Sequence, residues 1–61
     1  MATMAYRGLI LTAVEQPNGG FQVEIVPVEG GKSVLTSRFA EQFAAMASAR
    51  AIIDKGVIQP G

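Results

Sequence analysis

The candidate nucleophiles of this sequence are four hydroxyl side chains, Ser33, Thr36, Ser37 and Ser48. A hydroxyl nucleophile needs an adjacent base. Because the chain has no histidine and no cysteine, that base would have to be a lysine or a carboxylate. None of the four hydroxyls is spaced to pair with such a base on one element. Two carboxylates have structural explanations, since Glu24 falls within a predicted strand and Glu41 near the start of a predicted helix. We therefore predict that the protein is not an enzyme.

The run Gly30-Gly31-Lys32-Ser33 resembles the end of a phosphate-binding loop. Such a loop needs a further glycine five positions before the Gly-Lys pair, where this chain has Val26, and a helix directly afterwards. The β-type residues that follow favour a turn between strands instead. Without histidine or cysteine the chain also lacks the common soft metal ligands and any disulfide. We expect no cofactor and no metal.

Basic side chains are the remaining candidates for a binding site. Five Lys and Arg balance five Asp and Glu, and a net charge of zero argues against nucleic acid, whose binders carry a basic excess on one face. A sheet that presented Arg7, Lys32 and Arg38 together could still enter a DNA groove, although three glutamates share its strands. A small nucleic-acid-binding or antitoxin-like regulatory protein is therefore the alternative function.

The strands that would hold these side chains follow from the apolar pattern. Residues 5–15 and 21–28 are rich in large apolar and β-branched residues and are predicted to be strands. The Asn18-Gly19 pair between them favours a tight hairpin, because it accepts positive φ at low cost. A turn at Gly30-Gly31 precedes a shorter third strand over residues 33–38; the alternative is a loop that leads into the helix.

An alanine-rich segment, about residues 40–55, is predicted to be a helix that ends near Gly56, with a tail over residues 57–61. We predict one α+β domain over residues 1–61, a three-stranded antiparallel β-meander with the C-terminal helix packed on one face. Apolar residues recur at helical spacing and predict one buried stripe: Phe39, Phe43, Met46, Ala49 and Ile53.

A single helix covers one face of such a sheet, and the first strand is apolar on both faces. We expect the helix to cover the face of Ile10 and Val14, which leaves Leu9, Leu11 and Val26 exposed. Burying a leucine side chain contributes about 1.5–3 kcal/mol, and a domain this small buries only about 60% of its unfolded surface. We therefore predict a non-enzymatic, self-associating interaction module, a homodimer or the ligand of another protein. Two copies would meet sheet to sheet or through edge strands.

A phenylalanine that opens an alanine-rich helix ending in Ala-Ile-Ile-Asp-Lys-Gly (residues 51–56), after a β-hairpin, resembles small uncharacterised bacterial proteins. The resemblance covers about residues 6–56 and implies a bacterial β-β-β-α unit without a catalytic residue. The order is also similar in outline to antitoxin-type domains of the HicB class, whose Pro-Asp-Leu-Pro-Gly stretch this chain lacks.

The apolar runs are far shorter than the roughly 18 residues that a membrane-spanning helix needs. The N-terminus also lacks a charged region followed by an apolar core, the pattern of a signal peptide. We expect no membrane partner and take the cytoplasm as the default location.

Overall fold

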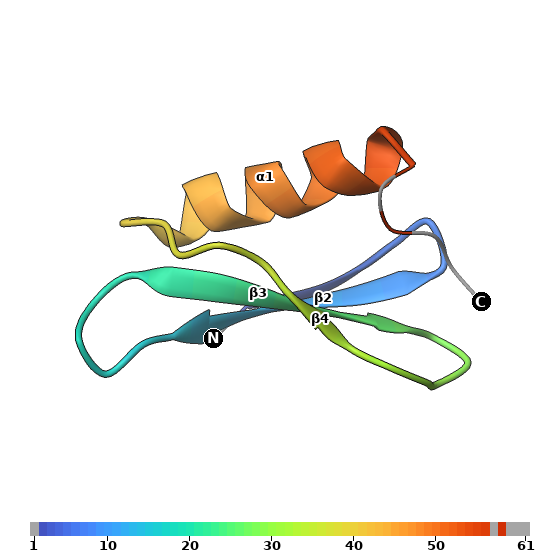
Figure 1. Cartoon of the computed structure of the whole chain (residues 1–61), viewed down its shortest axis with the longest axis horizontal. Coiled ribbons are helices and arrows are strands. Elements are labelled where there is room, and N and C mark those ends of the chain that lie inside the picture. The colour runs from blue at the N-terminus through green and yellow to red at the C-terminus, as the bar shows by residue number, and fades with distance from the viewer. Residues whose placement is uncertain (1, 57, 59–61) are drawn as a thin grey trace.

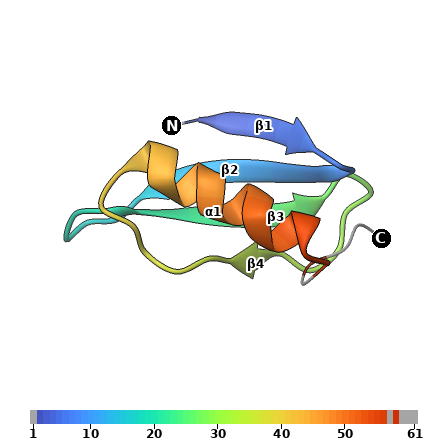
Figure 2. The same ribbon diagram turned by 90° about the horizontal axis from the view of Figure 1, so that it is seen from above.

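The computed structural model describes residues 2–56 and residue 58. One antiparallel sheet with the strand order β1-β2-β3-β4 carries a single helix across one face (Figures 1 and 2). The elements are β1 (Thr3–Tyr6), β2 (Leu9–Glu15), β3 (Phe21–Pro27), β4 (Val34–Leu35) and α1 (Gln42–Asp54). The predicted α+β class and antiparallel sheet are confirmed, but the sheet has four strands instead of three. Apart from residue 58, the predicted tail over 57–61 lies outside the described residues.

The predicted first strand, residues 5–15, is a hairpin in the structure. Arg7 and Gly8 both take positive φ (52° and 80°) and form a two-residue turn between β1 and β2. Positive φ at both central residues is the feature of type I′ turns, whose twist matches that of the paired strands. Residues other than glycine, asparagine and aspartate seldom adopt it. An Arg-Gly pair therefore does not mark a turn, and the sequence predicted an unbroken strand.

The predicted hairpin between β2 and β3 is confirmed, although its loop is longer than a two-residue turn. Glu15 pairs with Phe21 across a loop of residues 16–20. Gly19 and Gly20, rather than Asn18, take positive φ (93° and 85°). β3 ends at Pro27, one residue earlier than predicted, because proline has no N–H to donate to the ladder.

The predicted third strand, residues 33–38, is regular only at Val34–Leu35. Thr36 continues it irregularly: its N–H donates to the carbonyl of Val23 (3.0 Å), and its Oγ1 accepts from the Val23 N–H (2.9 Å). Phe39 and Phe21 then exchange two backbone hydrogen bonds of 2.7 and 2.8 Å. From Thr36 to Phe39 this segment advances three residues, whereas β3 advances only two, from Val23 to Phe21. The segment therefore holds one extra residue, which forms a bulge and ends the regular pairing.

α1 covers the predicted face of β3, where Val23 and Ile25 are buried, but the opposite face of β2 from the predicted one. Leu9, Leu11 and Ala13 of β2 are at most 1% exposed and lie beneath the helix. Register is the physical reason. Because the odd-length loop pairs Leu11 with Ile25, odd residues of both strands share a face. The expected grouping of Ile10 with Ile25 would need a shift of one residue. The core comprises Leu9, Leu11, Ala13, Val23, Ile25, Ala45, Met46, Ala49 and Ile53.

The helix begins at Gln42, two residues later than predicted, and ends at Asp54, one residue earlier. Its buried stripe includes Ala45 and Ala49, which are fully buried and have small side chains that let the helix lie close to the sheet. Phe43, predicted to be in the stripe, is 78% exposed. At about 100° per residue it lies about 160° from Ala45 and about 120° from Ala49 but only about 60° from Met46, so it borders the buried stripe rather than belonging to it.

Candidate interaction surface

Two of the three predicted self-association residues are inside the domain. Leu9 and Leu11 are fully buried between the sheet and α1, so they cannot contact another chain, and that part of the prediction is wrong. Val26 is on the side predicted for it: it pairs with Ile10 across β2 and β3, and both are half-buried.

The side of the sheet that faces away from α1 is named here the open face. Alternation and register assign nine residues to it: Thr3, Ala5, Ile10, Thr12, Val14, Gln22, Glu24, Val26 and Leu35. The helix packs on β2 and β3 from the other side, and Figure 1 shows no described element beneath the sheet. The open face is therefore a side of the sheet that none of the described elements covers.

An apolar row crosses three strands of the open face. Ala5 of β1 pairs with Ile10 of β2, which pairs with Val26 of β3. The next row is polar, with Thr12 paired to Glu24. The open face therefore has one apolar band and one band able to form hydrogen bonds.

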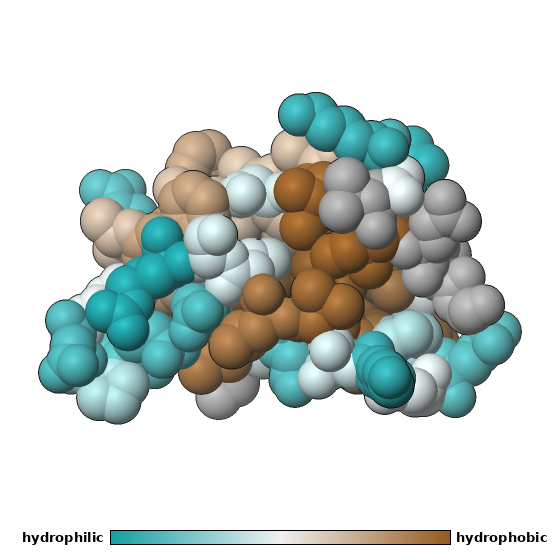
Figure 3. Space-filling view, in the orientation of Figure 1, coloured by the Kyte–Doolittle hydropathy of each residue, from teal (hydrophilic) through white to brown (hydrophobic). Residues whose placement is uncertain are grey.

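Apolar side chains also gather at the edge formed by β4. Figure 3 shows hydrophobic atoms running from α1 down over β4. Val34 pairs with Ile25 on the helix side and is 42% exposed, whereas Leu35 pairs with Glu24 on the open face and is 57% exposed. The apolar surface thus extends from the open face around this edge.

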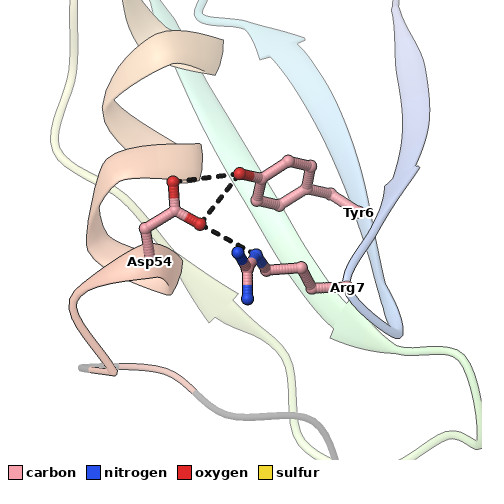
Figure 4. Close-up of polar contacts among 3 residues, drawn as sticks. All are labelled: Tyr6, Arg7 and Asp54. Atoms are coloured by element: carbon pink, nitrogen blue, oxygen red, sulfur yellow. Dashed lines mark hydrogen bonds and ion pairs between the residues drawn. The ribbon is translucent and has the colours of Figure 1, made fainter.

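A polar cluster joins the first turn to the end of the helix (Figure 4). The Tyr6 hydroxyl donates to the carboxylate of Asp54, with distances of 2.8 Å to Oδ1 and 3.0 Å to Oδ2. Arg7 Nε lies 3.0 Å from Asp54 Oδ1. The side chains of this ion pair are 66% and 46% exposed, so it contributes at most about 1 kcal/mol. The cluster connects the β1–β2 turn with the end of the helix.

The three basic residues predicted for nucleic acid are not gathered in one place. Arg7 is near the connection that contains Lys32, because the N–H of Val28 donates to the carbonyl of Gly8 (3.0 Å). Arg38 is at the opposite end of β3, beside Gly20. The seven residues of β3 separate these ends by about 20 Å at roughly 3.3 Å per residue. The structure brings Arg7 and Lys32 to one end of the sheet and leaves Arg38 at the other.

Sequence reasoning missed the apolar row and the Tyr6–Asp54 contact. The apolar row forms because the even-numbered residues of β2 face away from the helix. The length of the loop between β2 and β3 sets this register, and composition does not. Tyr6 and Asp54 are 48 positions apart, and no local pattern connects them.

Within residues 2–56 and 58, no group of three or more acidic, histidine or cysteine side chains is placed to hold a metal ion. None of the helical residues described forms a segment long and apolar enough to cross a membrane. Protein-family models, curated proteins and solved structures were compared with the chain, and none of them matches it.

Proposed function

We propose that this protein is a non-enzymatic interaction module that associates with further copies of itself through the open face of its sheet. The observation that supports this is the apolar row Ala5–Ile10–Val26 on a face that none of the described elements covers. Leu35, in the neighbouring row beside Glu24, and Val14, one row beyond Thr12, add apolar surface farther along the same face.

The small size of the chain favours a second copy as the partner that covers the open face. A stable interface buries about 800 Å² on each partner, which is about a fifth of the 3919 Å² that this chain exposes. Covering apolar surface contributes about 25 cal/mol per Å², an amount that matters in a domain whose single core rarely supplies more than about 3–5 kcal/mol.

The chemistry of the open face suits contact with its own copy. The chain has no net charge, so two copies do not repel each other at long range. Two sheets pack face to face with their strands within about 30° of each other. Glu24 lies in the row next to the apolar row, about 7 Å along the strands. An isologous stack of this area therefore includes Glu24 in the contact, where its carboxylate needs a hydrogen-bond donor on the other copy.

Sedimentation equilibrium from low micromolar to millimolar concentration tests the proposal. We expect the average mass to rise with concentration, and Val26→Glu to raise the dissociation constant at least about tenfold, because it removes about 1.5 kcal/mol of burial. Val34→Glu is the matched control. It makes the same change at a residue that is 42% exposed and lies on the helix side of β4, opposite Ile25.

A wild-type chain that keeps the monomer mass at every concentration contradicts the proposal. Equal weakening by both glutamate variants contradicts the role of the open face.

A further inference from the structure

The outer edge of β1 has neither a charged residue nor a proline of its own. β1 reads Thr3-Met4-Ala5-Tyr6, without a charge or a proline, and it pairs with β2 in unbroken register, without a bulge. Natural edge strands are usually very short, charged, bulged or covered. The opposite edge follows this rule, because β4 has only two regular residues and a bulge follows it.

The helix leaves the β1 edge accessible. Figure 2 shows α1 above β2 and β3, with β1 beyond its side. β1 is the first strand in the sheet order, and none of the described residues pairs with its outer side. An incoming strand could therefore align with β1 without displacing the helix.

The backbone groups that face this edge follow from the phase of the β1–β2 ladder. The carbonyl of Ala2 accepts from the N–H of Ala13 (2.8 Å), so Ala2 and Ala13 belong to a hydrogen-bonded pair. Such pairs alternate along antiparallel strands, and the next one is Met4 with Leu11. Thr3 and Ala5 consequently direct their N–H and C=O groups away from β2, to the free edge.

We propose that a second copy pairs antiparallel with this edge, with Thr3 of each copy opposite Ala5 of the other. The two-fold axis passes between the two Met4 residues, and the outward groups of Thr3 and Ala5 make up to four hydrogen bonds. The two four-stranded sheets become one sheet of eight strands.

A copy of the same chain satisfies this edge because the edge is self-complementary. Thr3 and Ala5 are two positions apart, so a two-fold rotation about Met4 brings each donor opposite an acceptor and leaves no outward group of β1 unused. Met4 packs against the core on the helix side, where two opposed residues of a non-hydrogen-bonded pair have their side chains close together. This inference rests on the proposed self-association, but it uses a different surface from the open face.

Ala5→Pro tests the edge, because it removes an outward N–H and keeps the β1–β2 hydrogen bonds. Proline is tolerated in an edge strand when its nitrogen faces solvent. Ala5 also belongs to the apolar row of the open face, so the control is Ala5→Val, which, like proline, keeps that row apolar but retains the N–H. We expect Ala5→Pro to weaken association at least about tenfold relative to Ala5→Val. Far-UV circular dichroism confirms that both variants are folded.

Amide hydrogen exchange of the wild-type chain gives a second test that needs no substitution. The amides of Thr3 and Ala5 should exchange more slowly as concentration rises, whereas the Met4 amide, which faces β2, should be protected at every concentration.

The outcomes separate this inference from the proposed function. If the chain self-associates but Ala5→Pro has no effect and the Thr3 and Ala5 amides exchange independently of concentration, the edge pairing is wrong and the open-face proposal stands. A chain that is monomeric at millimolar concentration overturns both. Slower exchange at Thr3 and Ala5, together with association that resists Val26→Glu, supports the edge and contradicts the open face.

Discussion

Gly20→Ala is expected to destabilise the fold more than any other glycine substitution in the β2–β3 loop. Gly20 has a φ of 85°, and a Cβ there would lie 2.9 Å from Cγ of Arg38 and 3.0 Å from the carbonyl oxygen of Phe39. The arginine side chain is flexible and can move. The carbonyl oxygen cannot move freely, because it accepts the 2.7 Å hydrogen bond from the N–H of Phe21.

The magnitude follows from separate terms. A non-glycine residue in the left-handed region costs about 1–2 kcal/mol. Weakening the hydrogen bond between Phe21 and Phe39 costs about 0.5–1.5 kcal/mol more. The lower entropy of the unfolded alanine chain offsets about 0.4–1 kcal/mol. We therefore expect Gly20→Ala to lower the free energy of unfolding by about 2 kcal/mol.

Gly19→Ala is the matched control, because Gly19 has a φ of 93° and no atom within 4 Å of the Cβ position. It should lose the conformational term alone, about 1 kcal/mol after the entropic offset. Urea and thermal unfolding followed by circular dichroism compare the two variants, and a difference of about 1 kcal/mol shifts Tm by roughly 4–8 °C in a domain of this size. Equal losses in the two variants would refute the argument that Gly20 is required by the approach of Phe39.

Three further substitutions test the fold. Leu11→Ala should lower the free energy of unfolding by about 2–5 kcal/mol, since Leu11 is fully buried. Ile10→Ala, on the open face, should lower it clearly less. Equal losses of the two variants in urea unfolding would contradict the assignment of Leu11 to the buried face. Thr36→Val should cost about 1–3 kcal/mol, because it leaves the N–H of Val23 without its 2.9 Å acceptor; Thr36→Ser keeps the oxygen and should recover most of that loss in the same assay. Phe43→Ser should change Tm little, because Phe43 is 78% exposed, and a large drop would place it in a contact within the domain.

The sequence predicted those elements whose signals are local. Alanine and other strong helix formers fixed the helix to within two residues, and the glycines after Asn18 marked the loop between β2 and β3. The turn at Arg7 escaped prediction, because an arginine before a glycine does not signal the left-handed backbone that Arg7 adopts.

The open face was only partly predictable, because its residues depend on whether the odd or the even positions of β2 face the helix. In β2, Leu9 and Ile10 are equally suited to either face, and composition does not decide between them. The number of loop residues between β2 and β3 decides which set pairs on the side of the helix. Val26 was assigned to the correct side, whereas Leu9 and Leu11 were not.

The contact between Tyr6 and Asp54 has a consequence for the order of folding. It joins residues 48 positions apart, and the core likewise unites Leu9 with Ile53. During synthesis the two hairpins therefore emerge before the helix that covers them. Until the helix has formed, their leucines and valines are exposed to solvent and favour aggregation. Final folding must wait for the last turn of the helix, so these contacts favour a concerted transition in which the first and last segments become ordered together.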